Sequence, residues 1–401
     1  MHSGMRIRAV AWLSLAAGPA AHAMTALQFS LNGPYVTSAG VYDDTGRLLR
    51  TLWSGRNLAA GAHTFIWDDR DDTGQLVARP TVSIRLLYHR IRYHWDGVIG
   101  NTSASFTGPG VHHSMFPPSS IALAGSRAVY AVGYNEGGVG THGFSLNDPQ
   151  RDLPPVLRAD AFTAWSLVAT DGRELYWANI GGLSAKTFVA ASSLDAADFT
   201  PFSAGTILCL NYLGPICYPG QEYKGIIDIG TDHGTAPTGL AVQTRGHILA
   251  VAHARQGTVE LFDKATGARL RTFTIPVSAD ASNQLAAAPN GDLWVITGTS
   301  LLRYTALDSK PALAATISGL SHPLAVAVHP SDDDVVLVAD GGASQQVKAY
   351  DHNGRLLWTY GQAGGYGNDP SVDAGKLWFR FDATLERTAL AVQANGSFWV
   401  V

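Results

Sequence analysis

The chain has 401 residues, of which only 15% are charged, and its formal net charge is −4. Without an excess of basic residues no nucleic-acid-binding surface is indicated, and we expect no nucleic-acid partner. The 43 glycines and 10 tryptophans are typical of many short strands joined by tight turns, and long charged helices are not expected. The composition therefore favours an all-β protein with a small domain beside a larger repeat array.

The N-terminus has the pattern of a secretory signal peptide. Arg6 and Arg8 precede an apolar run over 9–18, and Ala21-His22-Ala23 is a small-residue cleavage site. We expect residues 1–23 to be removed and the protein to be secreted or periplasmic. The alternative, a membrane anchor, is disfavoured because about ten apolar residues cannot span a bilayer, and no later run does so.

Residues 24–92 form a unit of their own. The stretch 41–52 predicts a strand, a turn and a second strand, and 61–68 and 82–88 predict two more. Four or more strands in so short a segment favour a small β-sandwich. Local hydrogen bonding explains the acidic turn at 68–72 better than a calcium site does.

This unit resembles the immunoglobulin-like domain of the FlgD family, found in secreted bacterial proteins and in flagellar hook assembly. The matching motifs are Tyr-Asp-x-x-Gly-Arg-Leu-x-Arg-Thr-Leu at 42–52, Leu-Ala-Ala-Gly at 58–61 and Trp-Asp-Asp-Arg-Asp-Asp-x-Gly at 67–74. The resemblance implies a spacer or packing module, because the family has no shared catalytic residues. Residues 93–118 lose the strand pattern and are expected to be a linker or a functional loop.

From residue 119 to 401 one sequence pattern recurs six times: a short apolar strand, a polar turn and a second apolar strand. The central turn residues are Gly125, Gly172, Gly246, Gly291, Asp333 and Gly396, so the spacings are 47, 74, 45, 42 and 63 residues. Such units cannot bury both faces alone, and copies must stack, which predicts a β-propeller. The long gaps indicate insertions near 181–235 and 361–388, although a weak seventh copy around 205–210 is an alternative for the first gap.

Two copies, at 323–361 and 237–273, carry a fuller four-strand signature that resembles NHL-type propeller repeats. The resemblance implies a propeller of six or more blades. The sequence stops within the second strand of the last copy, so that blade is expected to be truncated. Either the N-terminal side supplies the missing strands or the sequence is a fragment, and the absence of a polar tail favours the fragment.

The only two cysteines, Cys209 and Cys217, bracket a Gly-Pro turn. In an exported protein such a close pair predicts a local disulfide bond, and two buried free thiols are the alternative.

Ligands of propellers bind where loops from all blades converge. Exposed aromatic side chains beside amides and carboxylates suit sugar or peptide ligands, which singles out two loops as the candidate ligand-binding site. Their residues are Trp95, Asp96, Tyr134, Asn135 and Glu136. Ordinary loop packing is the competing explanation for both loops.

Histidines precede the first strand of several copies, which makes a divalent metal site the alternative. The candidate ligands are His233 and His322, with His112 or His113 as a third. Some NHL-like enzymes, the amidating lyases, bind zinc through channel histidines, so the resemblance implies a metal-dependent lyase or hydrolase as the second hypothesis. No nucleophile elbow, phosphate-binding loop or His-Glu-x-x-His motif is present. The leading hypothesis is an exported propeller that binds a glycan or a protein through the face that carries the insertions.

Overall fold

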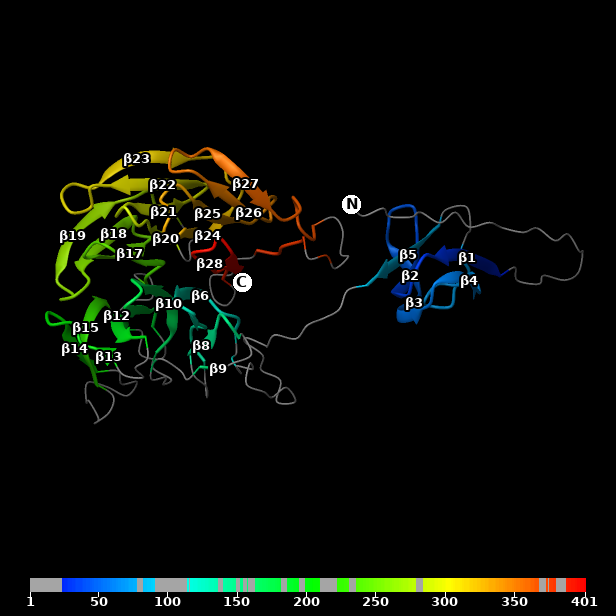
Figure 1. Cartoon of the computed structure of the whole chain (residues 1–401), viewed down its shortest axis with the longest axis horizontal. Helices are drawn as coiled ribbons and strands as arrows, with labels where there is room; N and C mark the ends of the chain where they lie inside the picture. The colour runs from blue at the N-terminus through cyan, green and yellow to red at the C-terminus, as the bar shows by residue number, and fades with distance from the viewer. Residues whose placement is uncertain are drawn as a thin grey trace, which may run out of the picture. The chain divides into compact units, whose positions relative to one another are not determined.

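The computed structural model describes most of the chain as two compact units, residues 1–95 and 96–401. The described residues are 24–77, 82–90, 114, 116–135, 140–148, 152–153, 157, 163–181, 186–194, 199–209, 222–230, 236–278, 284–367, 373, 375–379 and 387–401. Within them every regular element is a strand, as Figure 1 shows. The all-β class predicted from the composition is confirmed. No described segment forms a helix that could cross a bilayer.

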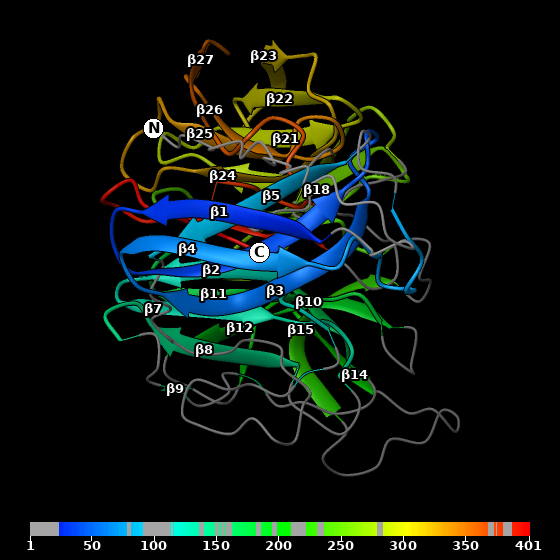
Figure 2. The same cartoon turned by 90° about the vertical axis from the view of Figure 1, so that its right-hand side faces the viewer.

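The N-terminal unit is a small β-sandwich. One sheet pairs β1 (Thr25–Leu31) with β4 (Gly61–Trp67), and the other has the order β3 (Leu48–Leu58), β2 (Tyr35–Tyr42), β5 (Ser83–His89). Buried side chains from both sheets, among them Leu27, Trp67, Val41 and Ile84, form one core. The long antiparallel strands are visible in blue in Figure 2. The predicted sandwich is therefore present.

The acidic turn of this unit satisfies its own backbone. The Asp71 carboxylate accepts hydrogen bonds from the hydroxyl of Thr73 at 2.7 Å and from the N–H of Gln75 at 2.9 Å. The first of these bonds is the main reason why the pKa of Asp71 lies below its ordinary value. Local hydrogen bonding thus accounts for this aspartate.

The described residues of the second unit form six antiparallel sheets, numbered here in chain order. Sheet 1 contains β6 (Ser120–Ala124), β7 (Arg127–Ala131), β8 (Thr141–Ser145) and β9 (Asp152–Leu153). Sheet 2 contains β10 (Trp165–Thr170), β11 (Glu174–Asn179), β12 (Thr187–Ser193), β15 (Glu222–Gly230) and β14 (Thr206–Cys209), with β13 (Phe199–Thr200) paired to β12. Sheet 3 contains β16 (Gly239–Val242), β17 (Ile248–His253), β18 (Thr258–Asp263) and β19 (Arg269–Thr274).

The remaining three sheets follow the same order. Sheet 4 contains β20 (Leu285–Ala287), β21 (Leu293–Thr297), β22 (Ser300–Thr305) and β23 (Ala312–Ile317). Sheet 5 contains β24 (Pro323–Val328), β25 (Val336–Asp340), β26 (Gln346–Tyr350) and β27 (Leu356–Tyr360). Sheet 6, among the described residues, contains only β28 (Leu390–Val392) and β29 (Phe398–Val400). All six repeats predicted from the sequence thus form strand pairs. Thr206–Cys209, in the region of the possible seventh copy, belongs to sheet 2.

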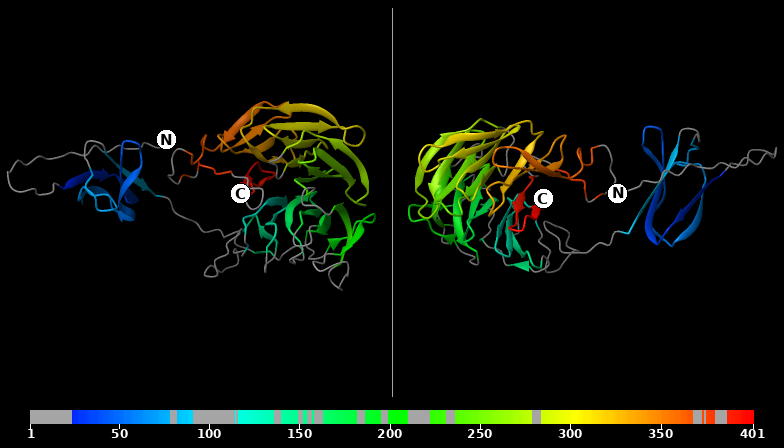
Figure 3. Two further views of the ribbon diagram at one scale, coloured as in Figure 1. Left: turned by 180° about the vertical axis from the view of Figure 1, so that it is seen from behind. Right: turned by 45° about the horizontal axis from the view of Figure 1, so that its top comes forward.

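The six sheets close into a ring, which makes this unit a six-sheet β-propeller. Each first strand contacts the first strand of the next sheet, and the contact between β28 and β6 completes the circle. Phe144 of sheet 1 packs edge-on against Trp399 of sheet 6, with ring centroids 5.2 Å apart. Both views in Figure 3 show the red strands of sheet 6 beside the teal strands of sheet 1.

The sequence forms these hairpins because apolar strands alternate with turns that contain glycine, which can adopt positive φ angles. Gly172 and Gly396, at the turns of sheets 2 and 6, have φ values of +87° and +84°. These angles are strained for residues with a Cβ atom, so glycine belongs there. The first strands are buried on both faces between neighbouring sheets, which explains why they are continuous apolar runs rather than alternating ones.

The ring has two sides. We call the side on which the first strands begin the strand-start side, and the opposite side, with the turns after the first and third strands, the turn side. The two insertions lie on different sides, although the sequence predicted a single insertion-bearing face. The first insertion reaches the turn side, where the N–H of Ala204 donates to the carbonyl of Thr266 at 2.8 Å. The second lies on the strand-start side, where Phe379 is hydrogen-bonded to the amide of Gln345.

Candidate functional site

Buried polar side chains surround the strand-start side of the ring. Ser119, just before β6, donates from its hydroxyl to the carbonyl of Ser166 in sheet 2 at 2.8 Å. Thr238, just before β16, donates to the Gln284 side chain just before β20 at 2.7 Å. These bonds join one sheet to the next, so the side chains hold the ring together and satisfy one another.

A second set of polar residues lies at the last positions of the second strands of the sheets. Asn179 at the end of β11 accepts the N–H of Ala164 at 2.6 Å, and Asp340 at the end of β25 accepts the N–H of His322 at 2.8 Å. Both side chains are fully buried. Each fixes the residue immediately before a first strand, so the loops on this side are held at their bases. Asp340 thus binds a backbone N–H eighteen residues earlier in the chain.

His322 is the one predicted metal ligand that the structure describes. It is half-buried on the strand-start side, and its backbone is held by Asp340 and by the N–H of Gly341. His233, His112 and His113 lie outside the described residues. Within the described part of the chain, no three His, Cys, Asp or Glu side chains are grouped so as to hold a metal ion. The metal site therefore stays a prediction.

Tyr134 and Asn135 also lie on the strand-start side, in the loop after β7. The N–H of Gly133 donates to the carbonyl of Trp165 at 2.7 Å, which ties this loop to the beginning of sheet 2. Asn135 is buried and Tyr134 is partly exposed. The other three predicted ligand-binding residues, Trp95, Asp96 and Glu136, lie outside the described residues. The structure thus places Tyr134 and Asn135 on the strand-start side, and the site of five residues stays a prediction.

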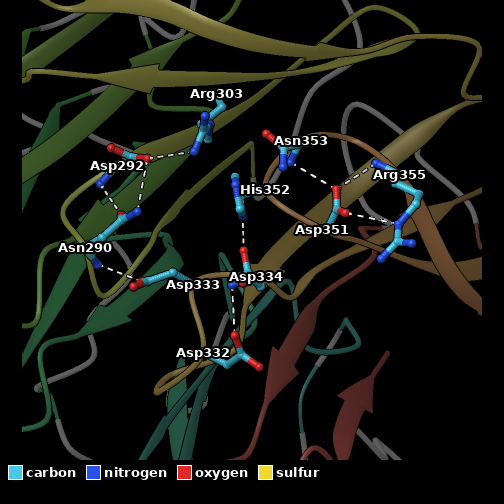
Figure 4. A network of polar contacts seen from close by, with 10 residues as sticks. All are labelled: Asn290, Asp292, Arg303, Asp332, Asp333, Asp334, Asp351, His352, Asn353 and Arg355. Atoms are coloured by element: carbon cyan, nitrogen blue, oxygen red, sulfur yellow. Dashed lines mark hydrogen bonds and ion pairs between the residues drawn. The ribbon is translucent and has the colours of Figure 1, made fainter.

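The turn side carries an acidic network between sheets 4 and 5, drawn in Figure 4. The N–H of Asn290 donates to Asp333 at 2.7 Å, and Asp292 lies 3.3 Å from the Arg303 guanidinium. Burial raises the pKa of Asp292 above its ordinary value even though Arg303 opposes the shift. Asp333 thus links the turns of sheets 4 and 5, and Asp292 holds Arg303 within sheet 4, so the visible role of both carboxylates is structural.

The same network extends along the turns of sheet 5. His352 forms an ion pair with Asp334, and Asp351 accepts the N–H of Arg355 at 2.8 Å. The bond to Arg355 is the main reason why the pKa of Asp351 lies below its ordinary value. The corresponding turn of sheet 3 has the same kind of hydrogen bond, in which Asp263 accepts the N–H of Thr266 at 2.8 Å.

The most exposed aromatic side chains of the described chain gather on one part of the ring. They are Trp358 and Tyr360 on β27, which are 39% and 44% exposed, and Trp378 in the segment that follows. Both β27 residues pack against Phe398 of β29, with ring centroids 6.0 and 5.5 Å apart. We call Leu356, Trp358, Tyr360 and Phe398 the aromatic surface. It lies where sheet 5 faces the two-stranded sheet 6.

Sequence reasoning missed the aromatic surface because 356–360 matches an ordinary fourth strand. The signal was nevertheless present. Trp358 and Tyr360 are two residues apart, so they lie on the same face of β27. Both pack on sheet 6, which has two strands among the described residues.

Comparison with known proteins gives likeness at the level of the fold. No protein family matches the chain, and no curated protein matches it. The β-propeller domain of Cps50 (Swd1) from Myceliophteria thermophila is 10% identical with a TM-score of 0.42, covering 71% of this chain and 84% of that one. A chain of a nidogen/laminin complex is 12% identical with a TM-score of 0.42, covering 61% and 80%. A chain of a mitotic checkpoint complex is 14% identical with a TM-score of 0.40, covering 75% and 77%.

Proposed function

We propose that this chain is a non-catalytic binding protein whose propeller takes a protein partner on the aromatic surface. The observation that carries the proposal is the exposure of Trp358 and Tyr360 beside Phe398. Exposed apolar patches on soluble proteins mark interaction sites, and tryptophan and tyrosine are the residues most enriched in the centres of protein interfaces.

The chemistry of this surface favours a protein over a glycan. Leu356 is 49% exposed and extends the two aromatic rings into an apolar strip. The four side chains of the aromatic surface include no charged or amide group, whereas sugar sites combine aromatic faces with such polar groups. Tyr134 and Asn135 have that polar character, and they lie in the loop after β7 rather than on the aromatic surface.

We further propose export, an FlgD-like sandwich and an NHL-like propeller, as the sequence motifs indicate. Cys209 ends β14 on the turn side, and Cys217 lies outside the described residues. An oxidising compartment would support the predicted Cys209–Cys217 disulfide. Peptide mapping by mass spectrometry under non-reducing conditions should recover the two cysteines in one cross-linked peptide, whereas alkylation of both in the native protein would contradict export-linked pairing.

The binding function is tested by replacing the aromatic rings. We expect the Trp358→Ser, Tyr360→Ser double variant to lose partners that the unchanged protein retains from a secreted-protein extract, as measured by quantitative mass spectrometry. Leu313→Ser is the matched control, because Leu313 is 54% exposed on β23, the fourth strand of sheet 4. Retention of the same proteins by all three forms would refute the proposal, and a glycan array on which only neutral sugars bind would replace the protein partner with a glycan.

A further inference from the structure

We propose that the strand-start side of the ring binds a carboxylate through Arg387, which lies three residues before β28. This inference goes beyond the proposed function, because it concerns another part of the propeller and a ligand of different chemistry. It follows from three observations: the position of Arg387 in the ring, the lack of a described counter-charge for its guanidinium, and the partners of the carboxylates on the same side.

Arg387 stands at a position that other sheets fill with an apolar side chain. The turns fix the comparison, because in sheets 3, 5 and 6 the residue that follows the first strand donates its N–H across the turn; these residues are Gln243, His329 and Gln393. Six residues before them lie Pro237, Pro323 and Arg387. Both prolines are buried, whereas Arg387 is half-buried.

Sheets 1 and 2 extend the comparison. Pro118 corresponds to Pro237, because the residue after each donates its N–H to the second strand of its own sheet. Trp165 corresponds to Pro323, because the N–H of the residue before each is bound by the polar side chain that ends the second strand. Pro118 and Trp165 are also buried, and Ser282, at this position of sheet 4, lies outside the described residues. Four sheets thus fill the position without a charge, so the fold does not require one there.

The guanidinium of Arg387 has no counter-charge in the part of the chain that the structure describes. Burial lowers its pKa below the ordinary value, and no ion pair or hydrogen bond opposes that effect. A guanidinium stays protonated at neutral pH. Arginine is almost never buried without a partner, since a charge removed from water loses hydration that only an opposite charge or hydrogen bonds can replace. Arg387 therefore has the environment of a residue that binds an anion.

Two buried carboxylates on the same side are already bound within their own sheets. The first strands contact one another around the ring, so the residues before them surround its centre. Near these residues, Asp340 lies 2.6 Å from the Lys348 ammonium, and Glu260 lies 3.1 Å from the Arg269 guanidinium. These two carboxylates are therefore committed to other cations, and a ligand is the remaining source of negative charge for Arg387.

The surroundings favour a carboxylate over a phosphate. Buried apolar side chains flank the beginning of β28: Leu324 and Phe379 share a cluster with Leu390, and Ile121 of sheet 1 shares one with Ala389. One guanidinium balances the single charge of a carboxylate and binds its two oxygens side by side. A phosphate dianion would bring a second charge to apolar surroundings, where burying it without a partner is costly.

The binding test uses the purified full chain with acetate, benzoate or phosphate, each at the ionic strength of a sodium chloride reference. We expect both carboxylates to raise the melting temperature, because they bind the folded state. Arg387→Gln should weaken their binding at least about tenfold, and Arg387→Lys should weaken it less, since an ammonium keeps the charge but cannot bind both oxygens in a fork. Arg255→Gln is the matched control. Arg255 is exposed after the second strand of sheet 3, on the same side, and its loss should change binding by about twofold or less.

Arg387→Leu separates a ligand site from a structural role. Leucine gives sheet 6 the apolar character that the other sheets have at this position, so we expect a melting temperature about 2 °C higher without ligand and no response to acetate or benzoate. A lower melting temperature would mean that the chain itself supplies the counter-charge. An unchanged response to the carboxylates would mean that they bind elsewhere, and stronger stabilisation of the unchanged protein by phosphate would replace the ligand class. Each of these three results overturns the proposal.

A further comparison distinguishes the two sources of a carboxylate. Acetylated tetra-alanine with a free carboxyl terminus is titrated beside its C-terminal amide and beside benzoate. Preference for the free peptide assigns the carboxylate to a chain end, and preference for benzoate assigns it to a small molecule; both results support the site. Equal binding of the free peptide and its amide, with no binding of benzoate, would show that no carboxylate is recognised.

Discussion

Lys348 lies 2.6 Å from the carboxylate of Asp340, and the same two positions in sheet 3 hold His253 and Glu260, 3.9 Å apart, with the basic and the acidic residue exchanged. Asp340 and His253 end the second strands of their sheets. On the third strand, Lys348 lies two residues after the residue that pairs with Asp340, and Glu260 lies two residues after the one that pairs with His253. Both pairs therefore lie diagonally across one hairpin, at the strand-start side, where each can anchor the loop before a first strand.

Removal of the Asp340 carboxylate should destabilise the propeller. Asp340 is fully buried, and it binds both the Lys348 ammonium and the N–H of His322. We expect Asp340→Ala to lower the free energy of unfolding by about 3–5 kcal/mol, because it leaves a charge without its partner. Asp340→Asn should cost less, since the amide oxygen still accepts the N–H. Urea denaturation of the three proteins measures the difference, and equal stability of Ala and Asn variants would contradict this role.

The reversed pair in sheet 3 predicts that the charges of sheet 5 can be exchanged. Lys348→Glu alone places two carboxylates at 340 and 348 and should be strongly destabilising. Adding Asp340→His to that variant recreates the arrangement of His253 and Glu260 and should recover at least half of the loss. A double-mutant cycle from thermal or urea unfolding gives the coupling. Additive effects of the two substitutions would show that the positions do not interact.

The ion pair between sheets 2 and 3 should make stability depend on pH in the acid range. Burial by itself raises the pKa of Asp171, but the Lys264 ammonium at 2.8 Å and the N–H groups of Glu174 and Arg173 more than offset it, so the pKa is lowered. A lowered pKa in the folded state stabilises the protein above the unfolded pKa, and this contribution is lost as the pH falls through the folded value.

Asp171→Asn should therefore cost about 2 kcal/mol at neutral pH, and the difference from the unchanged protein should shrink as the pH falls below about 4. Urea midpoints measured from neutral to acidic pH provide the comparison. Asp308→Asn, on a side chain that is 66% exposed, is the control and should change little at any pH. A constant difference across the pH range would exclude the ion pair as its cause.

The closure of the ring predicts that sheet 1 and sheet 6 stabilise one another. Phe144 is buried and packs on Trp399, so Phe144→Ala should cost about 3–5 kcal/mol. Trp358→Ser, on the aromatic surface, should cost less than Phe144→Ala, because 39% of the Trp358 side chain is already exposed to solvent. Calorimetric melting separates the two variants. Equal melting temperatures would mean that sheet 6 does not close the ring in solution.

The repeats predicted the ring because each copy contains its own local information: an apolar strand, a turn glycine such as Gly172 or Gly396, and a second strand. The same signals located the sandwich. Contacts between copies were not predictable in this way, because the bond from Thr238 to Gln284 or from Ser119 to Ser166 depends on how neighbouring sheets stack. The exposure of Trp358 and Tyr360 likewise depends on how sheets 5 and 6 pack against each other, which no single repeat records.

The predicted metal site can be tested through His322. His322 lies at the strand-start side as expected, with its backbone fixed by Asp340, and the other three predicted ligands lie outside the described residues. If the chain is a binding protein, elemental analysis of the purified protein should find only substoichiometric zinc, manganese, iron and copper. A stoichiometric metal that is lost in His322→Ala but kept in His329→Ala, a turn-side histidine, would instead establish a site built from several blades. That result would revive the lyase or hydrolase hypothesis and move the function from the aromatic surface to the strand-start side.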